Sequence, residues 1–310
     1  MASRPDVWPV ARLSSPDIAP AIVWATRSVR TATEAAIPYP HREPLGSLPP
    51  GTRTLVAVGG GTLLDAAKVF RRERAPGVFL VAVPSIWGSG AEASPVAVTN
   101  EGGRKVVRMG PEYLPDARVT WPALADTLPE RLARRACGDA WVHALEGFLS
   151  PLASEDLRRE IAGLMGVMLD LPLSNDPRWF EASAAACAAQ ARSSVGLVHG
   201  IAHTLEGPLR AAEPGFGWGH ALLCATFLAP VLALDEEVSG RTRETLSRYG
   251  VDQARVHEVG RALFESDAYD RALPALEAHW SAVLRDPATR TNSALVRAGH
   301  LAHFGKRAFA

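Results

Sequence analysis

The pattern of apolar and polar residues divides the chain near residue 122 into a mixed α/β part and a helical part. In the first part, Thr54–Val58 and Val78–Val83 are short, β-branched apolar runs typical of buried parallel strands. The segment between them, Thr62–Arg71, has helical spacing, so the three segments predict a βαβ unit. We expect residues 1–122 to form a shortened α/β domain with a parallel sheet.

The first fifty residues give a weaker pattern. Many prolines interrupt them, and the only helical spacing falls around Ile22–Ala35. No convincing pair of buried strands precedes Gly59. We therefore expect a helix here and no pair of strands before the glycines.

After Pro122 the signal is almost entirely helical, which predicts an all-helical domain over residues 123–310. The expected helices are Leu124–Leu149, Asp156–Leu171, Trp179–His203, His220–Leu234, Arg241–Tyr249, Arg255–Phe264, Tyr269–Leu284 and Ser293–Lys306.

Composition narrows the range of functions. The chain has 310 residues, and its 33 Lys and Arg balance its 33 Asp and Glu, so charge gives no reason to expect nucleic acid or an anionic membrane as a partner. No apolar run reaches the ~18 residues that suggest a membrane span. Three cysteines without paired spacing argue against a disulfide scaffold, and a reducing cytoplasm is the expected location.

Two loops rich in glycine and serine follow the expected strands. Gly59, Gly60 and Gly61 separate the first strand from its helix, an arrangement that lets backbone N–H groups approach a phosphate. The second loop, in PSIWGSGAEAS, carries hydroxyl groups on Ser85, Ser89 and Ser94. Loops at the carboxyl ends of parallel strands commonly bind ligands, so we expect a phosphate-bearing ligand. A plain tight turn is the alternative for the three glycines.

Candidate metal ligands occur in the helical part. Asp139 and His143 are four residues apart on one helix face, His199 and His203 repeat that spacing, and His220 begins another expected helix. A carboxylate with several imidazoles from different helices is a suitable donor set for Zn²⁺ or Fe²⁺. Taken singly, each pair also fits a surface hydrogen bond or a packed histidine.

Together these segments resemble the iron-containing (group III) alcohol dehydrogenase family, relatives of glycerol dehydrogenase and dehydroquinate synthase. VAVGGGTLLDAAK is similar to the pyrophosphate motif of the family, and PSIWGSGAEAS to its second nucleotide loop. GDAWVHALEG, VGLVHGIAHTLEGP, GWGHALL and RDPATRTN follow in the family's order, with Ala288 where a cysteine is common.

The resemblance implies a role for each motif residue. Asp139, His143, His199 and His220 would be metal ligands, and His203 would lie near the nicotinamide, where we hypothesise that it relays the alcohol proton to solvent. The residues that would contact NAD or NADP are Gly59, Gly60, Gly61, Asp65, Ser85, Ser89 and Ser94.

The resemblance thus implies a metal-dependent, NAD(P)-linked oxidoreductase that interconverts an alcohol and a carbonyl, and a homo-oligomer. The short nucleotide domain predicts a specialised or biosynthetic substrate, and a protein partner could complete that domain. Shortened relatives oxidise and decarboxylate a C-terminal Thr in daptide-type ribosomal peptides, so a peptide substrate is one alternative. A dehydroquinate-synthase-like lyase and a non-catalytic partner subunit are the others.

Overall fold

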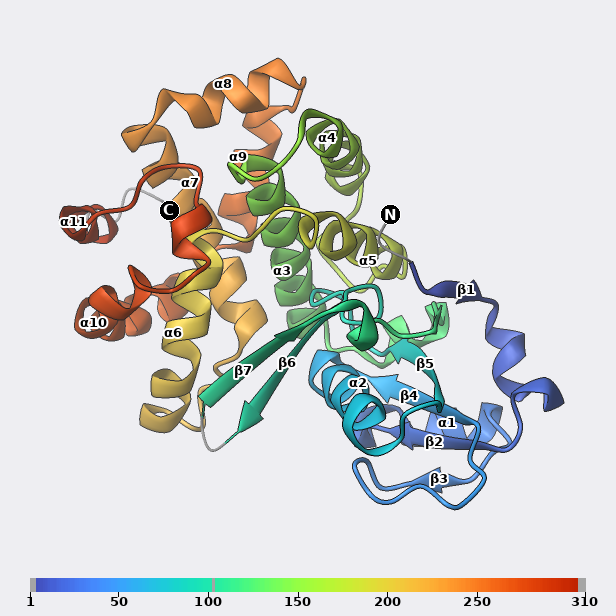
Figure 1. Cartoon of the computed structure of the whole chain (residues 1–310). Helices are drawn as coiled ribbons and strands as arrows, with labels where there is room; N and C mark the ends of the chain where they lie inside the picture. The colour runs from blue at the N-terminus through green and yellow to red at the C-terminus, as the bar shows by residue number, and fades with distance from the viewer. Residues whose placement is uncertain (1–3, 102–103, 306–310) are drawn as a thin grey trace. The chain divides into compact units, whose positions relative to one another are not determined.

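The computed structural model describes residues 4–101 and 104–305, which form two compact units (Figure 1). The first unit contains the described residues up to Pro129 together with Asn175–Ala188. The second contains Glu130–Ser174 and the described residues from Ala189 onward. The sequence had suggested that Asn175–Ala188 lies in the helical part, whereas its contacts assign it to the first unit. The domain boundary near residue 122 stays a prediction.

A six-stranded parallel sheet forms the centre of the first unit, which confirms the expected α/β class. Its strands, in spatial order, are β1 (Asp6–Trp8), β8 (Ala117–Val119), β5 (Phe79–Pro84), β4 (Thr54–Gly59), β2 (Ala21–Ala25) and β3 (His41–Arg42). The register pairs Gly59 with Pro84 at the ends of the two neighbouring central strands. The two loops that follow these strands therefore begin at the same edge of the sheet.

The strand β2 corrects the expectation for the N-terminal segment. We expected a helix around Ile22–Ala35, but Ala21–Ala25 is a fully buried strand, and the helix α1 covers only Arg30–Ala36. The run AIVWA is short, apolar and preceded by Pro20, the pattern of a buried parallel strand. The parallel sheet thus does have strands before Gly59, and β2 pairs directly with β4.

One helix covers the central strands with a continuous apolar face. Helix α2 (Gly61–Arg74) buries Leu63, Leu64, Ala67 and Phe70, which recur at helical spacing. They pack against alternate residues of the neighbouring strands, Ile22 and Trp24 of β2, Leu55 and Ala57 of β4, and Leu80 and Ala82 of β5. This core fixes the position of the glycine turn that joins β4 to α2.

The remaining elements of the first unit follow the second loop. Strands β6 (Val96–Glu101) and β7 (Arg104–Met109) form an antiparallel hairpin that the sequence did not predict. Helix α5 (Trp179–Gln190) returns to this unit, where Phe180 packs edge-on against Trp87 and the Ser183 hydroxyl accepts a hydrogen bond from the Gly88 N–H at 2.8 Å. These contacts anchor the loop after β5.

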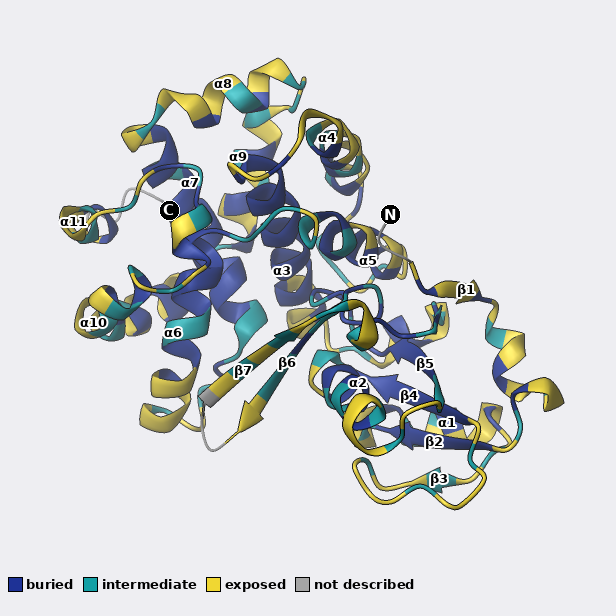
Figure 2. Cartoon of the chain, in the orientation of Figure 1, coloured by how far each residue is buried: buried dark blue, intermediate teal, exposed yellow. Residues whose placement is uncertain are grey.

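The second unit contains helices and, among the residues described, no strand, as expected. Its helices are α3 (Glu130–Leu149), α4 (Glu155–Leu169), α6 (Leu197–Ala212), α7 (His220–Val238), α8 (Gly240–Arg248), α9 (Gln253–Leu263), α10 (Ser266–Val283) and α11 (Leu301–Phe304). Helix α3 is central, and nearly all its residues from Ala133 onward are buried, whereas α8 exposes much of its surface (Figure 2). Helices buried all round belong to the core of a unit.

Three expected helices differ most from the structure. Trp179–His203 is two helices, because the chain leaves helical geometry between Gln190 and Leu197. There the Ser193 hydroxyl donates to the Gly147 carbonyl, which stabilises the turn. The expected helix Leu124–Leu149 begins only at Glu130. Ser293–Lys306 contains one short α-helix, α11, and its end at Lys306 lies outside the described residues.

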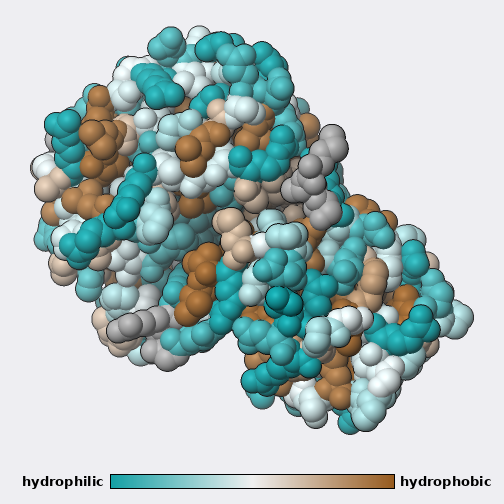
Figure 3. All heavy atoms as spheres, viewed as in Figure 1, coloured by the Kyte–Doolittle hydropathy of each residue, from teal (hydrophilic) through white to brown (hydrophobic). Residues whose placement is uncertain are grey.

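The visible surface is mainly hydrophilic, with apolar residues in small groups (Figure 3). Within the described part of the chain, no helix combines the length and apolar character that a membrane crossing requires.

Candidate metal centre and nucleotide loops

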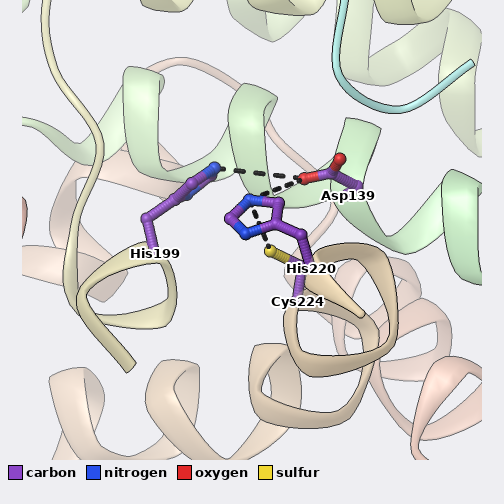
Figure 4. Close-up of side chains that lie close together, drawn as sticks. All are labelled: Asp139, His199, His220 and Cys224. Carbon is purple, nitrogen blue, oxygen red and sulfur yellow. Dashed lines mark hydrogen bonds and ion pairs between the residues drawn. The ribbon is translucent and has the colours of Figure 1, made fainter. Parts of the chain in front are cut away.

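Four potential metal donors converge inside the second unit. Asp139 comes from α3, His199 from the first turn of α6, and His220 and Cys224 from α7 (Figure 4). The Asp139 Oδ1 atom lies 4.0 Å from His199 Nε2 and 3.7 Å from His220 Nε2, and the Cys224 Sγ atom lies 3.6 Å from His220 Nε2. One donor atom from each residue lies within 4.8 Å of the others.

Close packing of α3 against α7 brings these donors together. A Cβ atom on Gly138 would lie 2.5 Å from the Cβ of Ala225, so only glycine permits this approach. Gly138 precedes Asp139, and Ala225 follows Cys224. The contact therefore places the aspartate of one helix opposite the donors of the other. On α7 itself, the spacing of four puts His220 and Cys224 on the same face.

The environment of Asp139 fits a divalent cation. Its Oδ1 atom is buried and accepts no hydrogen bond from any residue that the structure describes. Burying a charged carboxylate costs free energy unless a hydrogen-bond donor or a positive charge lies beside it. A cation at the common centre of the donors would provide that positive charge. Carboxylate, imidazole and thiol groups are donors that Zn²⁺ and Fe²⁺ accept. His220 keeps 27% of its side chain exposed, so the centre is accessible from one side.

His143 lies beside this set. Its Nδ1 atom is 3.0 Å from the Asp139 carbonyl oxygen and 3.6 Å from Asp139 Oδ1, and its ring centroid is 4.6 Å from that of His199. The set of mutually close donors thus contains three of the four expected ligands and adds Cys224, which the sequence had not suggested. Ligation by His143 stays a prediction.

Glu146 fixes the orientation of His199. Its Oε2 atom lies 2.7 Å from His199 Nδ1 and accepts the Gly196 N–H, while Oε1 accepts the Val198 N–H at 2.6 Å. Burial raises the pKa of Glu146 to about 7, although these hydrogen bonds act in the opposite direction. With Nδ1 directed at Glu146, Nε2 of the same ring faces Asp139, the orientation that a metal-binding imidazole requires.

His203, the expected catalytic residue, lies one turn after His199. Its ring stacks on that of His220, with centroids 5.5 Å apart and an interplanar angle of 17°. Its Nδ1 atom lies 3.6 Å from Asp286 Oδ2, and 27% of its side chain is exposed. An imidazole between a carboxylate and solvent, next to the donors, is placed to transfer a proton.

The expected nucleotide residues lie in the first unit. The two loops touch, because a Cβ atom on Gly61 would lie 2.5 Å from the Ser89 hydroxyl oxygen. Ser89 and Ser94 accept hydrogen bonds from Ala91 N–H and Val96 N–H, and thus stabilise their own loop. Ser85 is buried.

Asp65 makes contacts that tie α2 to the hairpin. Its Oδ2 atom accepts the Val98 N–H and its Oδ1 atom accepts from Lys68 Nζ, both at 3.0 Å. Lys68 is fully buried and also donates to the Val96 carbonyl. Both side chains therefore have a structural role, and nucleotide contact by Asp65 stays a prediction.

Sequence reasoning missed several residues of these sites. The spacing His-x₃-Cys from His220 could have indicated Cys224, and Glu146, seven residues after Asp139, lies on the same helix face. Asp286 lies in the motif RDPATRTN, but spacing could not show that it approaches His203, because the two residues meet only through the fold. Glu92, in the second loop, is also buried, which raises the pKa of its carboxyl to about 7.

Comparison with known proteins finds similarity to iron-containing alcohol dehydrogenases. The model of iron-containing alcohol dehydrogenases matches residues 50–122. The 1-propanol dehydrogenase PduQ of Salmonella typhimurium is 28% identical over 192 residues, 57% of this chain and 51% of that protein. An alcohol dehydrogenase of Thermococcus barophilus is 27% identical over 227 residues, 63% of this chain and 56% of that one. The chain spans about half the length of the curated relatives it matches.

Solved structures share the fold over the whole chain. The iron-containing alcohol dehydrogenase of Thermococcus thioreducens has a TM-score of 0.76 at 19% identity and covers 100% of this chain and 99% of its own. The sulfoacetaldehyde reductase of Bifidobacterium kashiwanohense, solved with NAD⁺, has a TM-score of 0.76 at 16% identity. The match covers 97% of this chain and 96% of that one. A parallel-sheet unit followed by a mostly helical unit is thus the fold that this chain shares with iron-containing alcohol dehydrogenases of known structure. The matches in sequence and in structure thus support similarity to the iron-containing (group III) alcohol dehydrogenase superfamily.

Proposed function

We propose that this protein is a metal-dependent, NAD(P)-linked oxidoreductase that interconverts an alcohol and a carbonyl compound. The observation that carries the proposal is the convergence of Asp139, His199 and His220 from three helices, with a buried Asp139 oxygen that no described residue bonds. We assign the metal to these three residues, with His143 as the further ligand expected from the family resemblance.

The metal would supply Lewis acidity, which lowers the pKa of an alcohol and polarises a carbonyl in the reverse direction. The residues of this chain would hold the metal and orient its ligands. Asp139 contributes one negative charge, so the centre keeps a net positive charge if its other protein donors are neutral imidazoles. Glu146 holds His199 by a 2.7 Å hydrogen bond. The exposed side of His220 leaves a route for the substrate.

The first unit would hold the nucleotide. Helix α2 begins after Gly60, where no side chain caps its first turn, and its N-terminal N–H groups and dipole favour a phosphate. The contact between Gly61 and Ser89 makes the two loops one surface. A nicotinamide would supply the hydride chemistry.

His203 would move the proton. In the oxidation direction, the imidazole would accept the proton of the alcohol, and Asp286, 3.6 Å from Nδ1, would orient the ring. We expect His203→Ala to lower kcat by roughly 10²–10⁴-fold, the usual contribution of general acid–base catalysis. Metal content and nucleotide affinity should stay unchanged. A pH–rate profile identical to that of the parent protein would exclude the relay.

Small primary alcohols and their aldehydes are the first substrates to test, because one matched relative bears the name 1-propanol dehydrogenase. We propose that the natural substrate is a more specialised compound of the same class, oxidised at one carbinol carbon. A panel of alcohols, β-hydroxy acids and a Thr-terminated peptide, each with NAD⁺ and NADP⁺, would identify the class.

The decisive experiment combines metal analysis with turnover. Protein purified without chelator should contain about one Fe or Zn per chain and should reduce NAD⁺ or NADP⁺ with at least one alcohol. Asp139→Asn should lose both metal and turnover, while the exposed control Asp126→Asn should keep them. Metal binding without nucleotide affinity in the parent protein would contradict the proposal and favour a non-catalytic subunit.

The lyase alternative lacks support in the described residues. A phosphorylated sugar acid needs cationic side chains, and the two arginines near the histidines are engaged elsewhere. Arg192 pairs with Glu160 at 2.5 Å, and Arg210 pairs with Glu206 at 2.9 Å.

A further inference from the structure

The three cysteines of the chain have different surroundings. Cys137 has its Sγ atom 3.9 Å from the Ser174 carbonyl, and Cys187 packs against Gly90. Cys224 is fully buried beside the donors of the candidate metal centre. Its sulfur lies 3.6 Å from His220 Nε2 and within 4.8 Å of a donor atom of each of Asp139, His199 and His220 (Figure 4).

We propose that Cys224 is a thiolate ligand of this metal, so that the centre has a mixed carboxylate, imidazole and sulfur donor set. The inference rests on the proposed function, because it requires a metal at the same centre. Three features of the structure support it. Cys224 lies one helical turn after His220 on the same face of α7, it is buried, and its sulfur lies 3.6 Å from His220 Nε2.

Binding through sulfur changes the chemistry of the centre. The thiol loses its proton to solvent as the sulfur–metal bond forms, so one proton is released and no electron is transferred. The carboxylate and the thiolate together cancel the two positive charges of the cation. Thiolate is a soft ligand, so it raises the preference for Zn²⁺ or Fe²⁺ over Mg²⁺ and Mn²⁺. It also weakens the Lewis acidity relative to a centre with only oxygen and nitrogen donors.

A second role for the sulfur makes a different prediction. If Cys224 only donates a weak S–H hydrogen bond to His220, the metal has oxygen and nitrogen ligands alone. The two arrangements differ in the presence of a metal–sulfur bond, which spectroscopy detects independently of activity.

Cobalt substitution provides the test. The full chain, stripped of metal and loaded with Co²⁺, should show visible ligand-field bands together with a near-ultraviolet sulfur-to-cobalt charge-transfer band. Cys224→Ser should keep the visible bands and lose the near-ultraviolet band. Cys137→Ser, a buried cysteine of α3, is the matched control and should keep both.

The outcomes separate the two hypotheses. Sulfur ligation would be overturned if the parent protein shows the visible bands without the near-ultraviolet band. It would also be overturned if Cys224→Ser shows a near-ultraviolet band as strong as that of the parent protein. Both results would leave the proposed function intact. No uptake of Co²⁺ by the parent protein would refute the metal site itself. If Cys224→Ser does not fold, as judged by circular dichroism, X-ray absorption of the Zn²⁺-loaded parent protein decides. A sulfur scatterer at about 2.3 Å supports the proposal, and oxygen and nitrogen scatterers alone overturn it.

Discussion

Glu146 Oε2 and His199 Nδ1 lie 2.7 Å apart in the interior of the second unit. The same carboxylate accepts the N–H groups of Gly196 and Val198, at the start of the helix that carries His199. One side chain of α3 thus sets both the beginning of α6 and the direction of its imidazole. In the proposed metal centre, this contact would set the direction of the His199 ligand.

Replacing Glu146 should therefore weaken metal binding without removing a ligand. Glu146→Gln keeps the volume but turns one acceptor into an N–H donor that faces other N–H groups. Loss of a residue that orients a ligand commonly costs 10–100-fold in metal affinity, and we expect a loss in that range by chelator competition. The exposed Glu244→Gln is the control. Equal affinity of Glu146→Gln and the parent protein would show that the contact does not orient His199.

The approach of α3 and α7 can be tested at Gly138. Gly138→Ala would place a Cβ atom 2.5 Å from Ala225 Cβ, and overpacking of this kind typically costs about 1–3 kcal/mol. We expect a lower Tm and weaker metal binding, because Asp139 is the next residue. Gly163→Ala is the matched control on α4, where nothing lies within 4 Å of the added Cβ. It should raise stability by about 0.4–1 kcal/mol. Unchanged metal affinity in Gly138→Ala would refute the coupling between this contact and the centre.

The glycine loops make a separate prediction for the first unit. Gly61→Ala would direct a Cβ atom to within 2.5 Å of the Ser89 hydroxyl oxygen and push the loops apart. We expect NAD(P) affinity to fall at least several-fold in calorimetric titrations, while metal content stays the same. The double variant Gly61→Ala/Ser89→Gly removes the clash and should recover much of the affinity. If the single variant binds the nucleotide normally, these loops are not the phosphate site.

Asp235 predicts a pH dependence of stability. Burial raises its pKa from 3.8 to about 8, although the amide of Asn292, at 2.6 Å, favours the charged form. Between these values the folded protein binds the proton more tightly than the unfolded chain does. The free energy of unfolding should consequently fall as the pH rises from about 4 to 8, by at most about 1.4 kcal/mol per pH unit for this one group.

Asp235→Asn should remove that part of the fall, which denaturant titrations at several pH values would measure as a flatter profile. The exposed Asp126→Asn should leave the profile unchanged. A variant profile as steep as that of the parent protein would mean that Asp235 does not remain protonated in the folded state.

The sequence predicted the parts of the fold with strong local patterns. The buried runs Thr54–Val58 and Val78–Val83 became β4 and β5, and the glycines after Val58 begin the turn into α2. The strand β2 was missed because its five residues were joined to the helical spacing that follows them. Strands of two or three residues, such as β1 and β3, have too few positions for a period to appear.

The candidate site was predictable where donors repeat at helical spacing. Asp139 and His199 stood out for that reason, and His220 as the first residue of another expected helix. The structure brings the three residues together. The roles of Glu146 and Asp286 depend on contacts between helices that are distant in sequence, at 53 and 83 residues from their histidine partners. Such contacts are decided by packing, which a local pattern does not encode.

The central claim is that one divalent cation binds among Asp139, His199 and His220. Crystals of the full chain grown with Fe²⁺ or Zn²⁺, with data collected on both sides of the metal absorption edge, test it directly. The account predicts one strong anomalous peak within bonding distance, about 2.0–2.2 Å, of the Asp139 oxygen and both imidazole nitrogens. An anomalous map without a peak among these three residues would contradict the claim, whether the metal binds elsewhere in the protein or does not bind.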